Sequence, residues 1–225
     1  MASKTKITFY GHSMFVVESE KGLKIGMDPY DEKVKSKLPD VSADIVTVSH
    51  SHFDHSNIKL FKGNPEIIKE AGIFKVKGIP FTGYSSFHDN NKGYLRGKNI
   101  IFKFEIDEIV FVHLGDFGSF SDAKILNELK NTDILFIPVG GVFTINSKEA
   151  LNLIKELKPK IAIPMHFKEK DTLVDVDEIN YFKNSLQDFM IAKEVDNGFE
   201  ITKEELPGST EIRIIYSFLK SNPFV

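Results

Sequence analysis

One short segment constrains the fold of this chain more than any other: an apolar run that ends in a cluster of histidines. Residues 44–49 read Asp-Ile-Val-Thr-Val-Ser, the near-continuous apolar pattern of a strand buried on both faces. The run His50-Ser51-His52-Phe53-Asp54-His55 follows at once. Because α/β sheets usually place their sites at the carboxyl ends of buried strands, the segment predicts an α/β fold with a polar site at this edge.

The cluster itself has the composition of a metal site. His50 and His52 are alternate residues and are expected to project to the same side. Asp54 and His55, at the turn that follows, can point towards a neighbouring position, so one segment can supply two ligands to each of two adjacent metals. Imidazole and carboxylate suit Zn²⁺ and also Mn²⁺ or Fe²⁺. The alternative is a chance group of polar surface histidines, but this spacing behind a buried strand favours metal binding.

Further ligands should come from the ends of other predicted strands. Asp116 follows Gly115, His166 follows Pro164-Met165, and His88 follows Ser86-Phe87. For His88 a plain surface role stays open. His113 lies within an apolar run, which favours a core or supporting histidine, and the role of His12 is undecided.

Composition excludes several other classes of protein. The chain has 225 residues, 41% of them hydrophobic, which suits one domain spanning residues 1–225. It has no cysteine, so disulfides and thiolate ligands are excluded and any metal is held by nitrogen and oxygen. A net charge of −3 without a basic block argues against nucleic-acid binding. No apolar stretch approaches the ~20 residues of a membrane span, and the polar start lacks a signal sequence, so we expect a cytoplasmic protein.

The predicted elements run from β-rich to βα units and back to β. We expect strands at residues 7–10, 14–17, 23–27, 44–49, 73–76, 81–87, 100–106, 109–113, 134–137, 161–163, 190–194 and 211–216. We expect short helical pieces over 57–72 and helices over 121–130 and 176–189. Another helix should begin after Asn146, which can form a capping box with Glu149, and should stop at Pro159. This order suggests two sheets between helical layers.

Several motifs together resemble a known family. The run Ser49 to His55 is similar to the signature of the metallo-β-lactamase superfamily, and the resemblance extends over nearly the whole chain. Further motifs resemble the stand-alone zinc-dependent hydrolases of this fold, which are close to the ascorbate-phosphate lactonases. They are Gly11-His12-Ser13, Asp28-Pro29, Ile137-Pro138-Val139-Gly140-Gly141 and Ile163-Pro164-Met165-His166. The resemblance implies a four-layer αβ/βα sandwich.

The resemblance also implies a set of ligands for two divalent metals, Zn²⁺ first, with Mn²⁺ or Fe²⁺ as alternatives. His50, His52 and His88 would hold one metal. Asp54, His55 and His166 would hold the second, and Asp116 would bridge both. Asp54 and Asp116 are also the expected catalytic carboxylates. Asp28 and Asp44 would either orient ligands or serve as turn and cap residues.

The expected activity is hydrolysis of a small ester, lactone or phosphate-bearing substrate by a hydroxide that two metals share. A phosphodiesterase on the same site, or a metal-binding protein without catalysis, stays as an alternative. Nuclease, di-iron oxygen-reducing and antibiotic-inactivating relatives fit less well, because the chain lacks a basic patch, a flavin domain and a signal sequence. Gly140 and Gly141 either let the backbone approach the substrate or make a turn.

Overall fold

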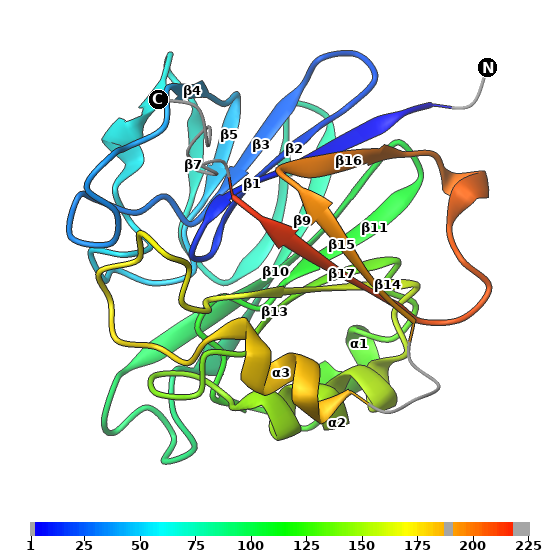
Figure 1. Cartoon of the computed structure of the whole chain (residues 1–225). Helices are drawn as coiled ribbons and strands as arrows, with labels where there is room; N and C mark the ends of the chain where they lie inside the picture. The colour runs from blue at the N-terminus through cyan, green and yellow to red at the C-terminus, as the bar shows by residue number, and fades with distance from the viewer. Residues whose placement is uncertain (1–2, 187–190, 218–225) are drawn as a thin grey trace, which may run out of the picture.

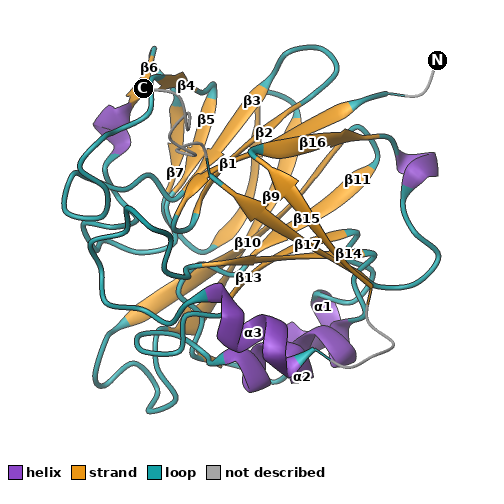
Figure 2. Ribbon diagram, viewed as in Figure 1, coloured by secondary structure: helices purple, strands orange, loops and turns teal. Residues whose placement is uncertain are grey.

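The fold is a sandwich of two large β-sheets with helices on one side. The computed structural model describes residues 3–186 and 191–217. The two sheets face each other across the middle of the molecule, and the α-helices lie together against one of them (Figures 1 and 2). This arrangement confirms the expected α/β sandwich. No helix in the described residues has the length and apolar character needed to cross a membrane.

The amino-terminal sheet has six strands in the described part of the chain. Their order is β16 (Gly198–Ile201), β1 (Thr5–Gly11), β2 (Met14–Glu18), β3 (Lys24–Met27), β5 (Ile45–Thr47) and β7 (Glu66–Ile68). The first four strands pair antiparallel, whereas β5 pairs parallel with β3 and with β7. Strand β5 is therefore internal and wholly buried, as its apolar sequence predicts.

The second sheet has nine described strands and carries the βα units. Its order is β12 (Ser119–Phe120), β9 (Ile79–Phe87), β10 (Lys98–Ile106), β11 (Ile109–His113), β13 (Ile134–Pro138), β14 (Ile161–Met165), β17 (Glu211–Tyr216) and β15 (Ile191–Asp196), with β8 (Gly72–Val76) paired to β9. From β11 to β15 every pair is parallel. A small sheet joins β4 (Val41–Ser42) and β6 (Phe61–Lys62).

The helices are short, apart from one. They are α1 (Lys124–Glu128), α2 (Ser147–Leu157), α3 (Ile179–Ser185) and the 3₁₀ turns η1 (Ile58–Leu60) and η2 (Lys203–Glu205). Helix α2 confirms the predicted capping box: the Asn146 side chain accepts from the Lys148 and Glu149 N–H groups, and Glu149 accepts from the Asn146 N–H. Capping satisfies backbone donors that the first helical turn leaves unpaired.

Two apolar cores hold the layers together. The larger one lies between the sheets and continues beneath the helices, so that Phe15 and Val17 of β2 share it with Phe136 of β13. The alternate residues of β2, Met14 and Val16, face a second, smaller core on the other side of the amino-terminal sheet. The strand period of two thus serves both cores. Loops, η1 and the small β4–β6 sheet, rather than α-helices, cover this outer face in the described residues.

The sequence interpretation was wrong over most of residues 57–72. Only η1 is helical there, and it is followed by β6 and β7. Strand β7 completes the sheet beside β5, so pairing with a distant strand outweighs local preference. The helix predicted at 121–130 shortens to α1. The helix predicted at 176–189 is observed as α3, and residues 187–190, which include the start of the strand predicted at 190–194, lie outside the described residues.

Candidate metal centre

The predicted site residues come from different strands but meet at one edge of the sandwich. His50, His52, Asp54 and His55 lie in the loop after β5. The chain positions the remaining residues directly after strand ends: His88 after β9, Asp116 near the end of β11, and His166 after β14. His12 lies in the tight turn between β1 and β2, and Asp28 directly follows β3.

Three histidines form what we call the outer cluster: His50, His52 and His88. One ring nitrogen from each lies within 4.8 Å of the others, a spacing that could hold a metal ion. His50 Nε2 is 3.0 Å from His52 Nδ1, and the ring centroids of His50 and His88 are 4.8 Å apart. His52 is exposed to solvent, so this cluster opens to the surface.

A second group, the inner cluster, consists of His12, Asp54, His55 and His166. One donor atom from each again lies within 4.8 Å of the others, and all four residues are buried. His12 Nε2 is 3.1 Å from Asp54 Oδ2, and its ring centroid is 4.1 Å from that of His166. The backbone N–H of His166 also donates to the His12 carbonyl at 2.7 Å.

The carboxylate of Asp116 lies between the two clusters. Its Oδ1 is 3.0 Å from His55 Nε2, and its Oδ2 is 3.3 Å from His166 Nε2. The same Oδ2 is 3.1 Å from His88 Nε2 and 3.8 Å from His50 Nε2. One buried carboxylate therefore reaches histidines of both clusters, the position that a bridging ligand requires.

Supporting hydrogen bonds orient the donor atoms. Asp28 Oδ2 lies 2.8 Å from His55 Nδ1, which leaves His55 Nε2 directed at Asp116. Asp28 also accepts from the Ser49 N–H at 2.8 Å and from the Ser49 hydroxyl at 2.6 Å. The Ser49 hydroxyl is in turn 3.0 Å from His50 Nδ1. A carboxylate that holds the far nitrogen of a histidine is a recurrent support in metal sites.

The two aspartates that the sequence left open have different roles. Asp28 supports His55 of the inner cluster. Asp44 instead accepts the Lys24 N–H at 2.8 Å and so joins the residue before β5 to the first residue of β3. His113 is a core histidine: its Nε2 donates to the Ser13 carbonyl at 3.0 Å, and its Nδ1 accepts the Gly115 N–H at 3.2 Å. Since both ring nitrogens are engaged, His113 stays outside the donor groups.

Gly140 is needed for packing against His166. A Cβ at this position would lie 2.0 Å from the His166 carbonyl oxygen, and at Gly141 it would lie 2.5 Å from Asp177 Oδ2. Gly140 therefore lets two backbone segments approach beside the inner cluster. This role differs from both that the sequence left open, an approach to the substrate or a turn, because the backbone that Gly140 approaches is the chain's own.

Backbone conformation at the site is unusual. His12, Asp28 and His166 adopt φ angles of 55°, 46° and 57°, in the left-handed region that residues with a Cβ seldom occupy. Such conformations cost of order 1–3 kcal/mol each and tend to collect at functional sites. All three residues belong to the inner cluster or hold one of its members.

Burial and charge set the protonation states of the clusters. Burial lowers the pKa of His50 to about 3 and that of His12 to about 4. Burial opposes ionisation of Asp116, but His166 and His55 outweigh it and hold its pKa well below the usual range. Burial also opposes a charge on His55, yet Asp116 and Asp54 raise its pKa well above normal. Neutral imidazoles and ionised carboxylates are the forms that bind metals, so His50, His12 and Asp116 are in the binding form, whereas His55 would release a proton when a metal binds.

The donor set fits divalent cations. Asp28, Asp54 and Asp116 place three carboxylates around the inner histidines. Several buried polar atoms of the clusters have no hydrogen-bond partner, which would be costly without a ligand. They are His12 Nδ1, Asp54 Oδ1, His88 Nδ1 and His166 Nδ1. The excess of negative charge and these nitrogen and oxygen atoms without hydrogen bonds together match a site for cations.

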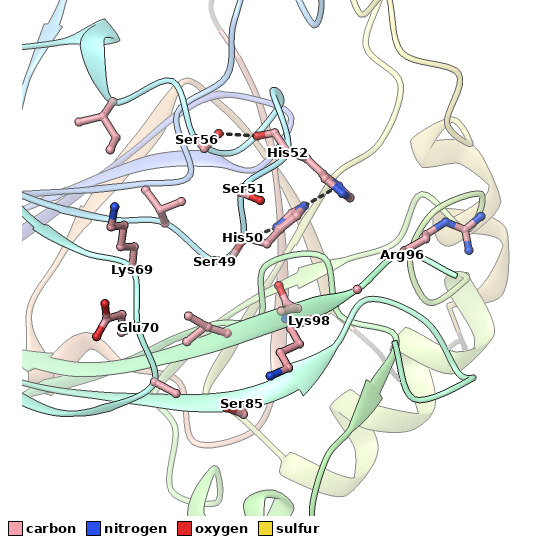
Figure 3. Close-up of a pocket in the computed structure, with 16 residues that line it drawn as sticks. Ser49, His50, Ser51, His52, Ser56, Lys69, Glu70, Ser85, Arg96 and Lys98 are labelled. Carbon is pink, nitrogen blue, oxygen red and sulfur yellow. Dashed lines mark hydrogen bonds between the residues drawn. The ribbon is translucent and has the colours of Figure 1, made fainter. Parts of the chain in front are cut away.

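Two of the hollows beside the outer cluster are large enough to matter for access. One of about 410 Å³ reaches residues of both clusters and is lined by His52, Phe53, Asp54, His88, Leu95, Arg96, Asp116, Phe143 and Val174. We call it the metal pocket. The other, of about 690 Å³, includes Lys69 and Lys98 in its wall and lies on the side of His50 and His52 that faces away from the metal pocket (Figure 3). A substrate can therefore reach the clusters from outside.

Sequence reasoning missed two parts of the site. The bond from His12 to Asp54 and the link through Ser49 both depend on contacts that local spacing does not indicate. The positions of His12 after Gly11 and of Asp28 before Pro29 were the only available signals, and neither indicates which side chain each residue contacts.

Comparison with known proteins agrees with this geometry. The profile of the beta-lactamase superfamily domain matches residues 6–166. A UPF0173 metal-dependent hydrolase of Carboxydothermus hydrogenoformans is 34% identical over 192 residues, which cover 72% of this chain and 84% of that protein. Its counterpart from Thermoplasma volcanium is 28% identical over 225 residues, with 87% and 99% covered. A solved Thermotoga maritima structure, assigned to the zinc-dependent hydrolases of the metallo-β-lactamase superfamily, shares 32% identity at a TM-score of 0.74, covering 95% of this chain and 98% of that one.

Proposed function

The chain belongs to the metallo-β-lactamase superfamily, and we propose that it is a metal-dependent hydrolase with two metals, acting on a small ester, lactone or phosphate-bearing compound. The observation that carries this proposal is the carboxylate of Asp116, buried between two groups of histidines. The names of the relatives support hydrolysis and metal dependence. The number of metals and the substrate class are our own assignment.

We assign the ligands by cluster. His50, His52 and His88 would hold one metal, while Asp54, His55 and His166 would hold the other. Asp116 would serve both. Zn²⁺ is the first choice, and Mn²⁺ or Fe²⁺ would suit the same nitrogen and oxygen donors.

The chain's own residues prepare the site for hydrolysis. When bound, a pair of divalent metals makes water acidic enough to ionise near neutral pH and polarises the bond under attack. Asp28 fixes the ring of His55, and His12 occupies Oδ2 of Asp54, which leaves Oδ1 of Asp54 without a hydrogen bond. Asp54 and Asp116 both line the metal pocket. We therefore assign them the catalytic carboxylate roles, next to the water and the substrate.

The substrate is proposed to be a small molecule. The metal pocket of about 410 Å³ suits a compound of that size and is lined by only one arginine or lysine, Arg96. A long polyanion such as RNA would need a row of cations, which this pocket lacks.

Metal content and turnover together test the proposal. Protein purified without chelator or a histidine tag should carry about two metals per chain by mass spectrometry. The loaded protein should hydrolyse members of a panel of lactones and carboxylic esters faster than bis(p-nitrophenyl) phosphate. His52→Ala should lose this activity while keeping its fold. Preferred turnover of the phosphodiester would instead favour a phosphodiesterase, and bound metal without any hydrolysis would favour a non-catalytic protein.

A further inference from the structure

We infer that Arg96 recognises an anionic group of the substrate in the metal pocket, so that the substrate is an ester with an apolar body and a carboxylate or phosphate beyond the scissile bond. This inference rests on the proposed function and names its substrate class. It draws on the fixed position of Arg96, its lack of an acidic partner, and the apolar residues beside it.

The loop that carries Arg96 is held in one conformation by a single side chain. It connects β9 to β10, and the carboxylate of Asp89 accepts hydrogen bonds from four backbone N–H groups within it. The donors are Asn91, Gly93, Leu95 and Arg96, at 2.8 to 3.0 Å. Because the carboxylate closes the loop on itself, the backbone of Arg96 is fixed next to His88.

The Arg96 side chain is positioned but not neutralised. Its Nη2 donates to the Val142 carbonyl at 3.2 Å, and its Cζ lies 5.5 Å from the centroid of the Phe143 ring. In the described part of the chain, no carboxylate oxygen lies within 4.0 Å of its guanidinium nitrogens. Arg213, the other arginine, instead pairs with Glu211 and stacks on Phe199. Several N–H donors of Arg96 therefore remain for a ligand.

Nearby carboxylates are already engaged. Asp89 and Glu149 share a small hollow with Arg96, but Asp89 binds its own loop and Glu149 completes the capping box of α2. The other carboxylates in the metal pocket are Asp54 and Asp116, which we assign to the metals. An arginine offers a planar fork that fits carboxylate or phosphate oxygens in pairs, which a lysine cannot do.

The rest of the pocket wall is apolar. Phe53 and Leu95 are 43% and 65% exposed, and Phe143 and Val174 line the same space. Exposed apolar side chains at the mouth of a pocket favour a ligand with an apolar portion. Lys33, whose Nζ lies 5.3 Å from the Phe53 ring, is a further cation near this mouth.

The larger hollow offers a competing place for an anion. It contains Lys69 and Lys98, but Glu70 lines it as well. Arg96 lines this hollow too, but Figure 3 shows its guanidinium group beyond His50 and His52, on the side away from Lys69. Lys98 is a matched control, because it lies two residues from Arg96 and carries the same charge but, unlike Arg96, does not line the metal pocket.

A pair of esters tests the inference. Mono-p-nitrophenyl suberate and p-nitrophenyl octanoate share a reacting ester and an apolar chain, and only the first ends in a carboxylate. Hydrolysis adds water across either ester and releases the acid and p-nitrophenol. In the metal-loaded protein we expect kcat/KM to favour the suberate by about 10- to 100-fold, mainly through KM, as for a hydrogen-bonded ion pair.

The readout is the ratio of kcat/KM for the suberate to kcat/KM for the octanoate, because a change in metal loading affects both values alike. Arg96→Ala should abolish the ratio, and Arg96→Lys should keep only part of it. Lys98→Ala and Lys33→Ala should leave it unchanged. A ratio that persists in Arg96→Ala, or that disappears in Lys98→Ala, overturns the inference.

A binding measurement separates this inference from the proposed function. The unreactive anilides, suberic acid monoanilide and octananilide, can be titrated by calorimetry into zinc-loaded wild type and Arg96→Ala. The acid should bind more tightly than the neutral anilide in the wild type only. If neither ester is hydrolysed but this preference is present, the proposed function fails and the anion site stands. If esters are hydrolysed and both proteins bind the two anilides alike, the anion site fails.

Discussion

The inner and outer clusters use the same kind of side chain but differ in their exposure, chiefly at His52. His12, Asp54, His55 and His166 are buried and tied to their neighbours by hydrogen bonds. In the outer cluster, His52 is exposed, and its ring nitrogen Nδ1 lies within hydrogen-bond distance of another histidine, His50.

This difference indicates that the two clusters have different roles. The inner cluster is held from several sides by the loops that follow β1, β3 and β14. The outer cluster faces the hollows through which a substrate can enter. We expect changes in the inner cluster to affect both fold and metal, and changes in the outer cluster to affect metal and turnover alone.

The largest effect is expected where the clusters meet. Asp116→Asn keeps the shape of the side chain but removes the charge that reaches both groups. We expect both metals to be lost and turnover to fall by more than about 1000-fold, beyond the ~10- to 100-fold typical of supporting residues. Metal analysis by mass spectrometry checks this, and a variant that keeps one metal at full occupancy would show that Asp116 serves a single cluster.

Rescue by imidazole should separate the two clusters. His52→Ala and His166→Ala each remove one donor, and both should lose activity. Added imidazole should restore part of the activity in His52→Ala, because that position is open to solvent. The His166 position is fully buried, so no rescue is expected there. Equal rescue in both variants would contradict the contrast in accessibility.

A smaller effect is expected from the residue that holds His55. Asp28→Asn should weaken metal binding by about 10- to 100-fold while a folded protein remains. Asp44→Asn is the control, since Asp44 also accepts a backbone N–H beside a strand but does not contact either cluster. Titration with a metal-sensitive dye would measure the metal affinity of both variants. Equal losses of affinity would argue that Asp28 acts through the stability of the fold alone.

The smallest effect on metal binding should come from packing behind the inner cluster. Gly140→Ala places a Cβ against the His166 carbonyl and should cost about 1–3 kcal/mol of unfolding free energy. Gly208→Ala is the matched control, because no atom lies within 4 Å of the position that its Cβ would take. Denaturant unfolding compares the two. A Gly140→Ala protein as stable as wild type would mean that the two backbone segments separate freely.

Local sequence determined much of this protein. The capping box of α2 and the apolar runs of β5 and β2 are visible in a few neighbouring residues, and each predicts the observed element. The His-x-His-x-Asp-His run likewise identified the loop on which the candidate site is built. These signals are readable because helix and strand periods repeat within a few residues.

Only the tertiary structure decided which of these residues meet. Residues 66–68 became a strand because β5 offers an edge to pair with, and no local pattern indicates that partner. The contacts of Asp116 with both clusters, of His12 with Asp54, and of Arg96 with the metal pocket also join residues that are distant in sequence. Local periodicity specifies which side of an element a residue faces. Contacts between separate loops depend on how the two sheets pair and stack, which is set by the whole core at once.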